Sequence, residues 1–106
     1  MKVNIDFSVF LPQRSAGVVT GSLELSNVPR AGETLSLELP PVKGVEKPAF
    51  FYGQLTVENV IHPTNGNAWV LLGLQDVELE NEADLFSLTL FLEQGFGFFF
   101  DSHLSG

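Results

Sequence analysis

The sequence has no cysteine, and only one tryptophan and one tyrosine among its 106 residues. The absence of cysteine excludes disulfides, thiolate metal sites and a cysteine nucleophile, and it suits a reducing compartment. No run of about 18 consecutive apolar residues occurs, so the sequence predicts no transmembrane helix and no membrane partner. The first ten residues lack the apolar core and cleavage site of a signal peptide, and we therefore expect a cytoplasmic protein.

Positive charge is scarce as well. Five lysines and arginines stand against 13 aspartates and glutamates, which gives a formal net charge of −8. A surface of this charge repels phosphates and argues against a nucleic-acid partner. The chain is 44% hydrophobic with ten phenylalanines, too apolar to be disordered. Its length indicates a single domain over residues 1–106 with one core.

Apolar and polar residues alternate in most segments, and this period of two predicts β-strands. In residues 3–10, the odd-numbered positions are apolar and most of the even-numbered ones are polar. A shift of the apolar phase near Asn59 indicates a bulge, and Asn65-Gly66 predicts a tight turn in a hairpin connection over 62–67. Further strands are predicted over residues 18–26, 34–39, 49–61, 68–74 and 96–101. Short strands separated by turns predict an all-β fold, a small antiparallel β-barrel or sandwich of about seven strands.

Residues 82–94 allow two interpretations. The even-numbered residues from 86 to 92 are apolar, which favours a strand over 85–93. A single C-terminal helix is the alternative, because Asn81 would serve as its N-cap and Gly95 would follow its last turn.

The negative charge is confined to one half of the sequence. Residues 1–47 carry five bases and five acids, whereas residues 48–106 carry eight acids and no base. Five of these acids occupy every second position: Asp76, Glu78, Glu80, Glu82 and Asp84. In an extended strand they would project from one face in a row of roughly 26 Å. A turn at residues 80–82 would instead fold the row into a tighter cluster.

The acidic row has two main interpretations. It is either the solvated face of an edge strand or a docking surface that steers a basic protein toward the chain. A metal site is disfavoured, because alternate strand residues lie about 7 Å apart and cannot chelate one ion without bending. The sequence therefore predicts no metal and no cofactor.

Phenylalanines crowd the C-terminal end, three of them consecutively at 98–100. Consecutive side chains on a strand point to opposite faces, so these rings fit either a strand buried on both faces or an exposed apolar patch. On the second interpretation, Phe98 and Phe100 join the acidic row in a predicted partner-binding surface, and a homodimer is left open.

Catalysis finds little support in the sequence. It contains no nucleophile elbow, no phosphate-binding loop and no dinucleotide fingerprint. His62 and His103 are 41 residues apart with no motif to orient them. We predict that the chain is not an enzyme.

Three short stretches resemble a pattern in small bacterial and phage-associated proteins with SH3-like barrels. Residues 28–37 read VPRAGETLSL, residues 57–62 read VENVIH and residues 70–72 read VLL. In those proteins a V-P-R-x-G-[DE] turn starts a strand, and a V-x-x-V-x-H strand follows. In its small size, acidity and lack of cysteine, the chain is also similar to immunity proteins that neutralise secreted nuclease toxins, including those of contact-dependent growth inhibition systems. The first resemblance implies a β-barrel, and the second implies a toxin partner. Neither carries over functional residues.

These observations predict a non-catalytic acidic module that binds a basic protein partner. Its most specific form is an immunity or inhibitor protein that neutralises a basic toxin such as a nuclease. The alternative is a homo-oligomeric structural or phage-type assembly subunit that uses the phenylalanine-rich C-terminal surface.

Overall fold

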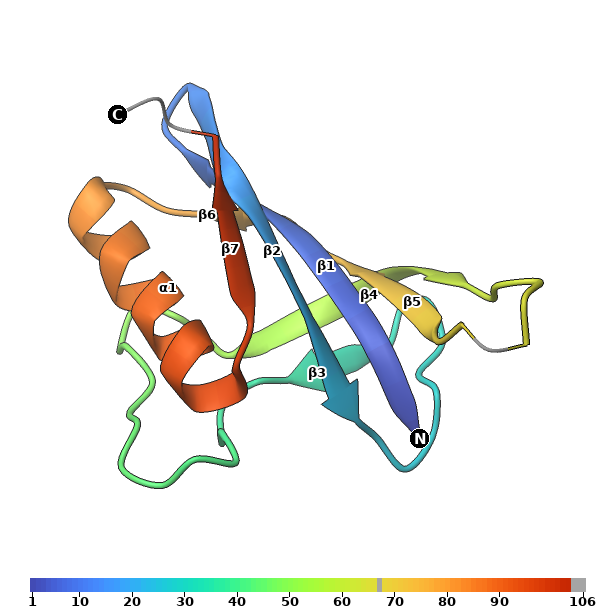
Figure 1. Cartoon of the computed structure of the whole chain (residues 1–106). Helices are drawn as coiled ribbons and strands as arrows, with labels where there is room; N and C mark the ends of the chain where they lie inside the picture. Colours follow the sequence, from blue (N-terminus) through green and yellow to red (C-terminus); the bar gives the residue numbers. More distant parts are fainter. Residues whose placement is uncertain (67, 104–106) are drawn as a thin grey trace.

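A computed structural model describes residues 1–66 and 68–103. Within them, seven strands form one mixed sheet with a single α-helix on one side (Figure 1). In chain order the elements are β1 (Lys2–Leu11), β2 (Arg14–Glu24), β3 (Thr34–Ser36), β4 (Gln54–Ile61), β5 (Val70–Leu74), β6 (Val77–Glu78), α1 (Glu82–Phe96) and β7 (Phe99–Ser102). Residue 67, part of the predicted hairpin connection, lies outside the described residues.

The sheet has the strand order β3-β4-β5-β1-β2-β7, with β6 also paired to β1. Strand β1 is antiparallel to β2 but parallel to β5 and β6. The prediction of about seven strands is confirmed, whereas the antiparallel barrel or sandwich is wrong. The sheet stays open, because β3 and β7 lie at opposite ends of the strand order instead of pairing. The parallel pairings bring together segments about 70 residues apart, which alternation within each segment does not reveal.

The favoured strand over 85–93 is also wrong, and the helical alternative is correct. Asn81 is the N-cap, as the alternative required, and its side chain accepts a hydrogen bond from Asp84 N–H at 2.8 Å. The helix ends at Phe96, and the glycine that follows its last turn is Gly97 rather than Gly95. Gly97 is left-handed, with φ 73°, and its N–H donates to the Glu93 carbonyl while Phe98 N–H donates to that of Leu92.

The other strands follow the predicted pattern with shifted ends. The expected strand over 34–39 stops at Ser36, and the one over 49–61 starts only at Gln54. The bulge near Asn59 is confirmed, since the register of β4 on β5 shifts between Val57 and Asn59.

Helix α1 packs on one face of the sheet, and the core lies between them (Figure 1). Leu88 and Leu92 face the odd-numbered side chains of β1, all of which are buried. Phe51, in the segment before β4, closes this core. Its ring packs edge-to-face on that of Phe91, with 6.3 Å between the ring centroids. The even-numbered side chains of β1 point to the opposite face, which we call the outer face. The helix of the described residues is not long and apolar enough to cross a membrane.

Candidate partner-binding surface

The structure divides the predicted acidic row into two parts. Asp76, Glu78 and Glu80 are exposed, and they alternate with the buried side chains of Val77 and Leu79 as predicted. The chain then turns at Glu80-Asn81 and enters α1, so the row is folded and not straight.

The remaining two acids of the row lie at the start of the helix. Glu82 and Asp84 are in the first turn of α1, where the helix dipole favours negative charge. Glu82 also accepts a hydrogen bond from the Arg14 guanidinium at 2.7 Å. Both carboxylates therefore favour the start of the helix, and the contact with Arg14 also anchors Glu82.

Two acids that are not part of the acidic row lie beside Asp76 on the outer face. Asp6 of β1 and Glu58 of β4 line, together with Asp76, a shallow hollow of about 280 Å³. Glu78 projects to the same side, because it is two residues beyond Asp76 and its register partner is Phe10, an even-numbered residue of β1. We call Asp6, Glu58, Asp76 and Glu78 the acidic surface. The outward position of Asp6 was readable from the alternation in β1, but its neighbours depend on strand order.

No ion pair within residues 1–66 and 68–103 involves the acidic surface, although Arg30 lines a neighbouring hollow together with Glu58. The two ion pairs of the described residues join the N-terminal amino group to Glu24 and Arg14 to Glu82. Two of the lysines are engaged elsewhere: Lys2 lies over the Trp69 ring at 5.3 Å, and Lys47 donates to the Phe51 carbonyl. The described residues hold no group of three His, Asp or Glu side chains that could bind a metal ion. The four carboxylates of the acidic surface are therefore available to positively charged groups of another molecule.

The phenylalanines predicted for the binding surface lie on the inner side of β7. Phe98 is only 3% exposed and stacks on Phe96 with 5.2 Å between ring centroids. Phe100 is half-buried, because it pairs with the buried Val19 of β2 and therefore points to the same face. Phe99, between them, is 64% exposed. The placement of Phe98 and Phe100 on an exposed surface is thus wrong, and Phe99 is the accessible ring.

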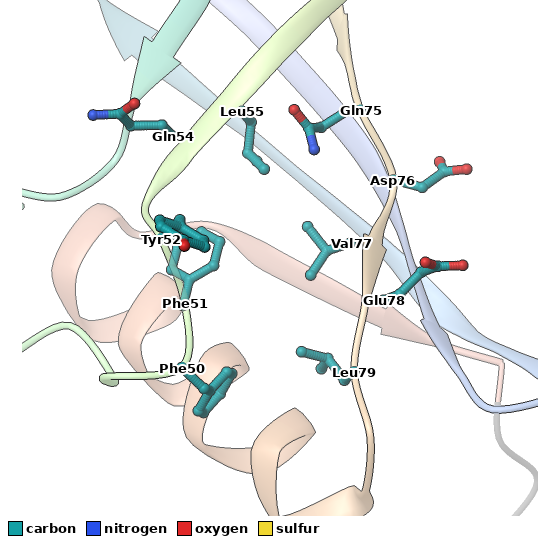
Figure 2. Close-up of a pocket in the computed structure, with 10 residues that line it drawn as sticks. All are labelled: Phe50, Phe51, Tyr52, Gln54, Leu55, Gln75, Asp76, Val77, Glu78 and Leu79. Atoms are coloured by element: carbon teal, nitrogen blue, oxygen red, sulfur yellow. The ribbon is translucent and has the colours of Figure 1, made fainter.

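A groove of about 500 Å³ separates the start of β4 from the segment 75–79 (Figure 2). Its floor is formed by the buried side chains of Leu55, Val77 and Leu79, which point toward the helix side. Phe50 and Tyr52 stand on one wall, and the Tyr52 side chain is 87% exposed. Figure 2 also shows Asp76 and Glu78 directed away from the floor. The groove thus combines an apolar floor with two carboxylates on its outer rim.

Comparisons with protein-family models, with curated proteins and with solved structures find no match for this chain.

Proposed function

We propose that this chain is a non-catalytic module that binds a basic protein. The observation that carries the proposal is the acidic surface, where β1, β4 and β6 each contribute one carboxylate and Asp76, just before β6, contributes a fourth. No ion pair of the described residues neutralises them. Like charges gathered on one face repel one another, and a partner that supplies lysine and arginine relieves this repulsion. The same charge disfavours nucleic acid as the partner.

In its most specific form, the proposal makes the chain an immunity protein that acts in the cytoplasm and neutralises a basic toxin such as a nuclease. Its small size, its net charge of −8 and the lack of cysteine support this form. In such a complex, long-range attraction sets the association rate and a few apolar contacts set the lifetime.

The test compares two variants with the same net charge. Asp76→Asn with Glu78→Gln removes two carboxylates from the acidic surface, and Glu46→Gln with Glu93→Gln removes two exposed ones elsewhere. Immobilised wild-type chain is used to capture proteins from a cell extract, and association with the captured basic protein is then followed by stopped flow at several salt concentrations. We expect the first variant to associate roughly 5–10-fold more slowly at low salt, with a flatter salt dependence, and the control to change less than about 2-fold. Equal rates for both variants would refute a role for the acidic surface.

A second candidate is a homo-oligomeric subunit that assembles through β7. Phe99 favours it, because this exposed ring lies on β7, the last strand in the order of the sheet. Strand β7 pairs with β2 along one edge, and its other edge is the edge of the sheet. Sedimentation of the wild-type chain and of Phe99→Ser decides this candidate: an oligomer that the substitution dissociates supports it, and a monomeric wild type excludes it.

A further inference from the structure

The groove lies where β4 and the segment that follows β5 diverge from each other. The pairing of β4 with β5 ends at Val57 and Leu74, and the last hydrogen bonds between the two segments join Thr56 and Gln75. Gln75 N–H donates to the Thr56 carbonyl at 2.9 Å, and Thr56 N–H donates to the Gln75 side-chain Oε1 at 2.7 Å. A side chain thus replaces the next backbone partner. After Gln75 the segment that follows β5 no longer runs beside β4. At Val77 it begins β6, which pairs with β1.

Backbone groups on both walls are directed into the groove. Leu79 N–H donates to the Phe10 carbonyl of β1 at 2.8 Å. Alternate residues of a strand turn their N–H and C=O to opposite edges, so those of Glu78 point away from β1 and into the groove. On the other wall, Gly53 and Val57 bond to the β3 side whereas Thr56 bonds to Gln75. By the same alternation, Gln54 directs its backbone groups into the groove.

We infer that the groove accepts an extended segment of a basic protein as an added strand between β4 and β6. The inference rests on the proposed function for the nature of the partner, and adds where and in which conformation it binds. An inserted strand finds backbone partners on Gln54 and Glu78, which is the mode of recognition by strand addition. Within the described residues β6 pairs with β1 alone, so its second edge is available.

The two faces of the groove define the sequence of the segment. Side chains of one parity would lie over Leu55, Val77 and Leu79, and would have to be apolar. Those of the other parity would emerge on the outer face beside Asp76 and Glu78, which favours lysine or arginine. The expected ligand is therefore a segment in which apolar and basic residues alternate, rather than a basic cluster alone.

The test uses a capped seven-residue peptide of alternating lysine and valine, titrated into the isotopically labelled full chain and followed by NMR. We expect saturable shifts of the backbone amides of Gln54, Leu55 and residues 77–79. N-methylation of two adjacent central amides removes one donor to each wall and should weaken binding at least about 5-fold, because each lost hydrogen bond accounts for roughly 2–10-fold. A peptide of the same composition with its lysines and valines in two blocks should bind at least about 5-fold more weakly.

Two variants of the chain test the same hydrogen bonds by a change at Glu78 instead of a change in the peptide. Glu78→Thr removes the charge and keeps the N–H, whereas Glu78→Pro removes both. We expect the proline variant to bind the peptide at least about 3-fold more weakly than the threonine variant. If the proline variant does not fold, the N-methylated peptide decides the question alone.

The outcomes separate the added strand from the proposed function. Undiminished binding of the N-methylated peptide, shifts confined to residues outside the groove, or no binding at millimolar peptide would each overturn strand addition. The proposed function would survive if Asp76→Asn with Glu78→Gln still slowed association with the basic partner protein. Equal binding of a peptide with glutamate in place of lysine would overturn the basic pattern and contradict the proposed function as well.

Discussion

The side-chain Oδ1 of Asn81 accepts a hydrogen bond from the backbone N–H of Asp84 at 2.8 Å. Asn81 itself is extended, with φ −157° and ψ 170°, so it belongs geometrically to the preceding segment and caps the following one. This contact marks the point where the alternation of residues 76–80 gives way to a helix. It therefore divides the acidic row between the outer face and the first turn of α1.

Removal of this cap should destabilise the chain. We expect Asn81→Ala to lower the free energy of unfolding by about 1 kcal/mol, because one N–H of the first helical turn loses its acceptor. Asn81→Asp and Asn81→Ser keep an acceptor and should stay within about 0.5 kcal/mol of the wild type. Urea denaturation measures all three, and an alanine variant as stable as the serine variant would contradict the cap.

Phe86 and Leu88 distinguish the helix from a strand. They would share a face of a strand, but in α1 the Phe86 side chain is 69% exposed and that of Leu88 is fully buried, at 0%. Phe86→Ser should change the free energy of unfolding by less than about 0.5 kcal/mol. Leu88→Ala should lower it by about 2–5 kcal/mol through the cavity that it leaves. Chemical denaturation of both variants checks the helix directly, and equal losses would speak for a strand.

Gly21 and Gly66 form a matched pair for the packing of Phe98. A Cβ at Gly21 would collide with the Phe98 ring, whereas a Cβ at Gly66 would meet open space. Gly21→Ala should therefore destabilise the chain by about 1–3 kcal/mol, since the buried ring has to move. Gly66→Ala should have an effect within about 0.5 kcal/mol. Thermal unfolding of the two variants gives the comparison, and similar melting temperatures would show that Phe98 does not lie over Gly21.

Glu24 gives the chain a small pH-dependent contribution to stability. The N-terminal amino group donates a hydrogen bond to its carboxylate at 2.8 Å, and this contact lowers the pKa of Glu24 below its usual value of 4.5. A depressed pKa in the folded state means that the contribution is present above about pH 4.5 and is lost as the pH falls through the folded-state value. The pair is exposed, so salt should weaken it.

The expected result is a urea midpoint slightly lower for Glu24→Gln than for the wild type near pH 7. The two midpoints should converge in acid below the folded-state pKa. Glu46→Gln, at another exposed position, serves as the control and should show no such convergence. A gap between Glu24→Gln and the wild type that grows in acid would contradict a lowered pKa of Glu24 in the folded chain.

Local patterns predicted the elements better than their arrangement. The alternation of residues 3–10 corresponds to β1, and the phase shift near Asn59 corresponds to the bulge in β4. The segment 85–93 was ambiguous because its apolar residues fit a period of two as well as the buried face of a helix. Tertiary packing decides in favour of the helix, since Leu85, Leu88 and Leu92 then cover the open core side of the sheet.

The candidate site depended still more on long-range pairing. The spacing of Asp76 and Glu78 marks them in the sequence, but nothing in the sequence associates them with Asp6 and Glu58, which lie on other strands. Phe98 and Phe100 were assigned to the surface because the parity of a strand does not say which face is buried. The pairing of Val19 with Phe100 sets that face.

The sequence by itself determined the segregation of charge, the outward parity of Asp76 and Glu78, and the capacity of Asn81 to begin a helix. These properties reside in the order of neighbouring residues and in backbone geometry that repeats every two or four positions. The tertiary structure alone decided that β1 runs parallel to β5 and β6, and that the chain parts from β4 at Gln75. Contacts between distant segments arise only when the whole core is buried at once, and for that reason the groove and the acidic surface exist only in the folded chain.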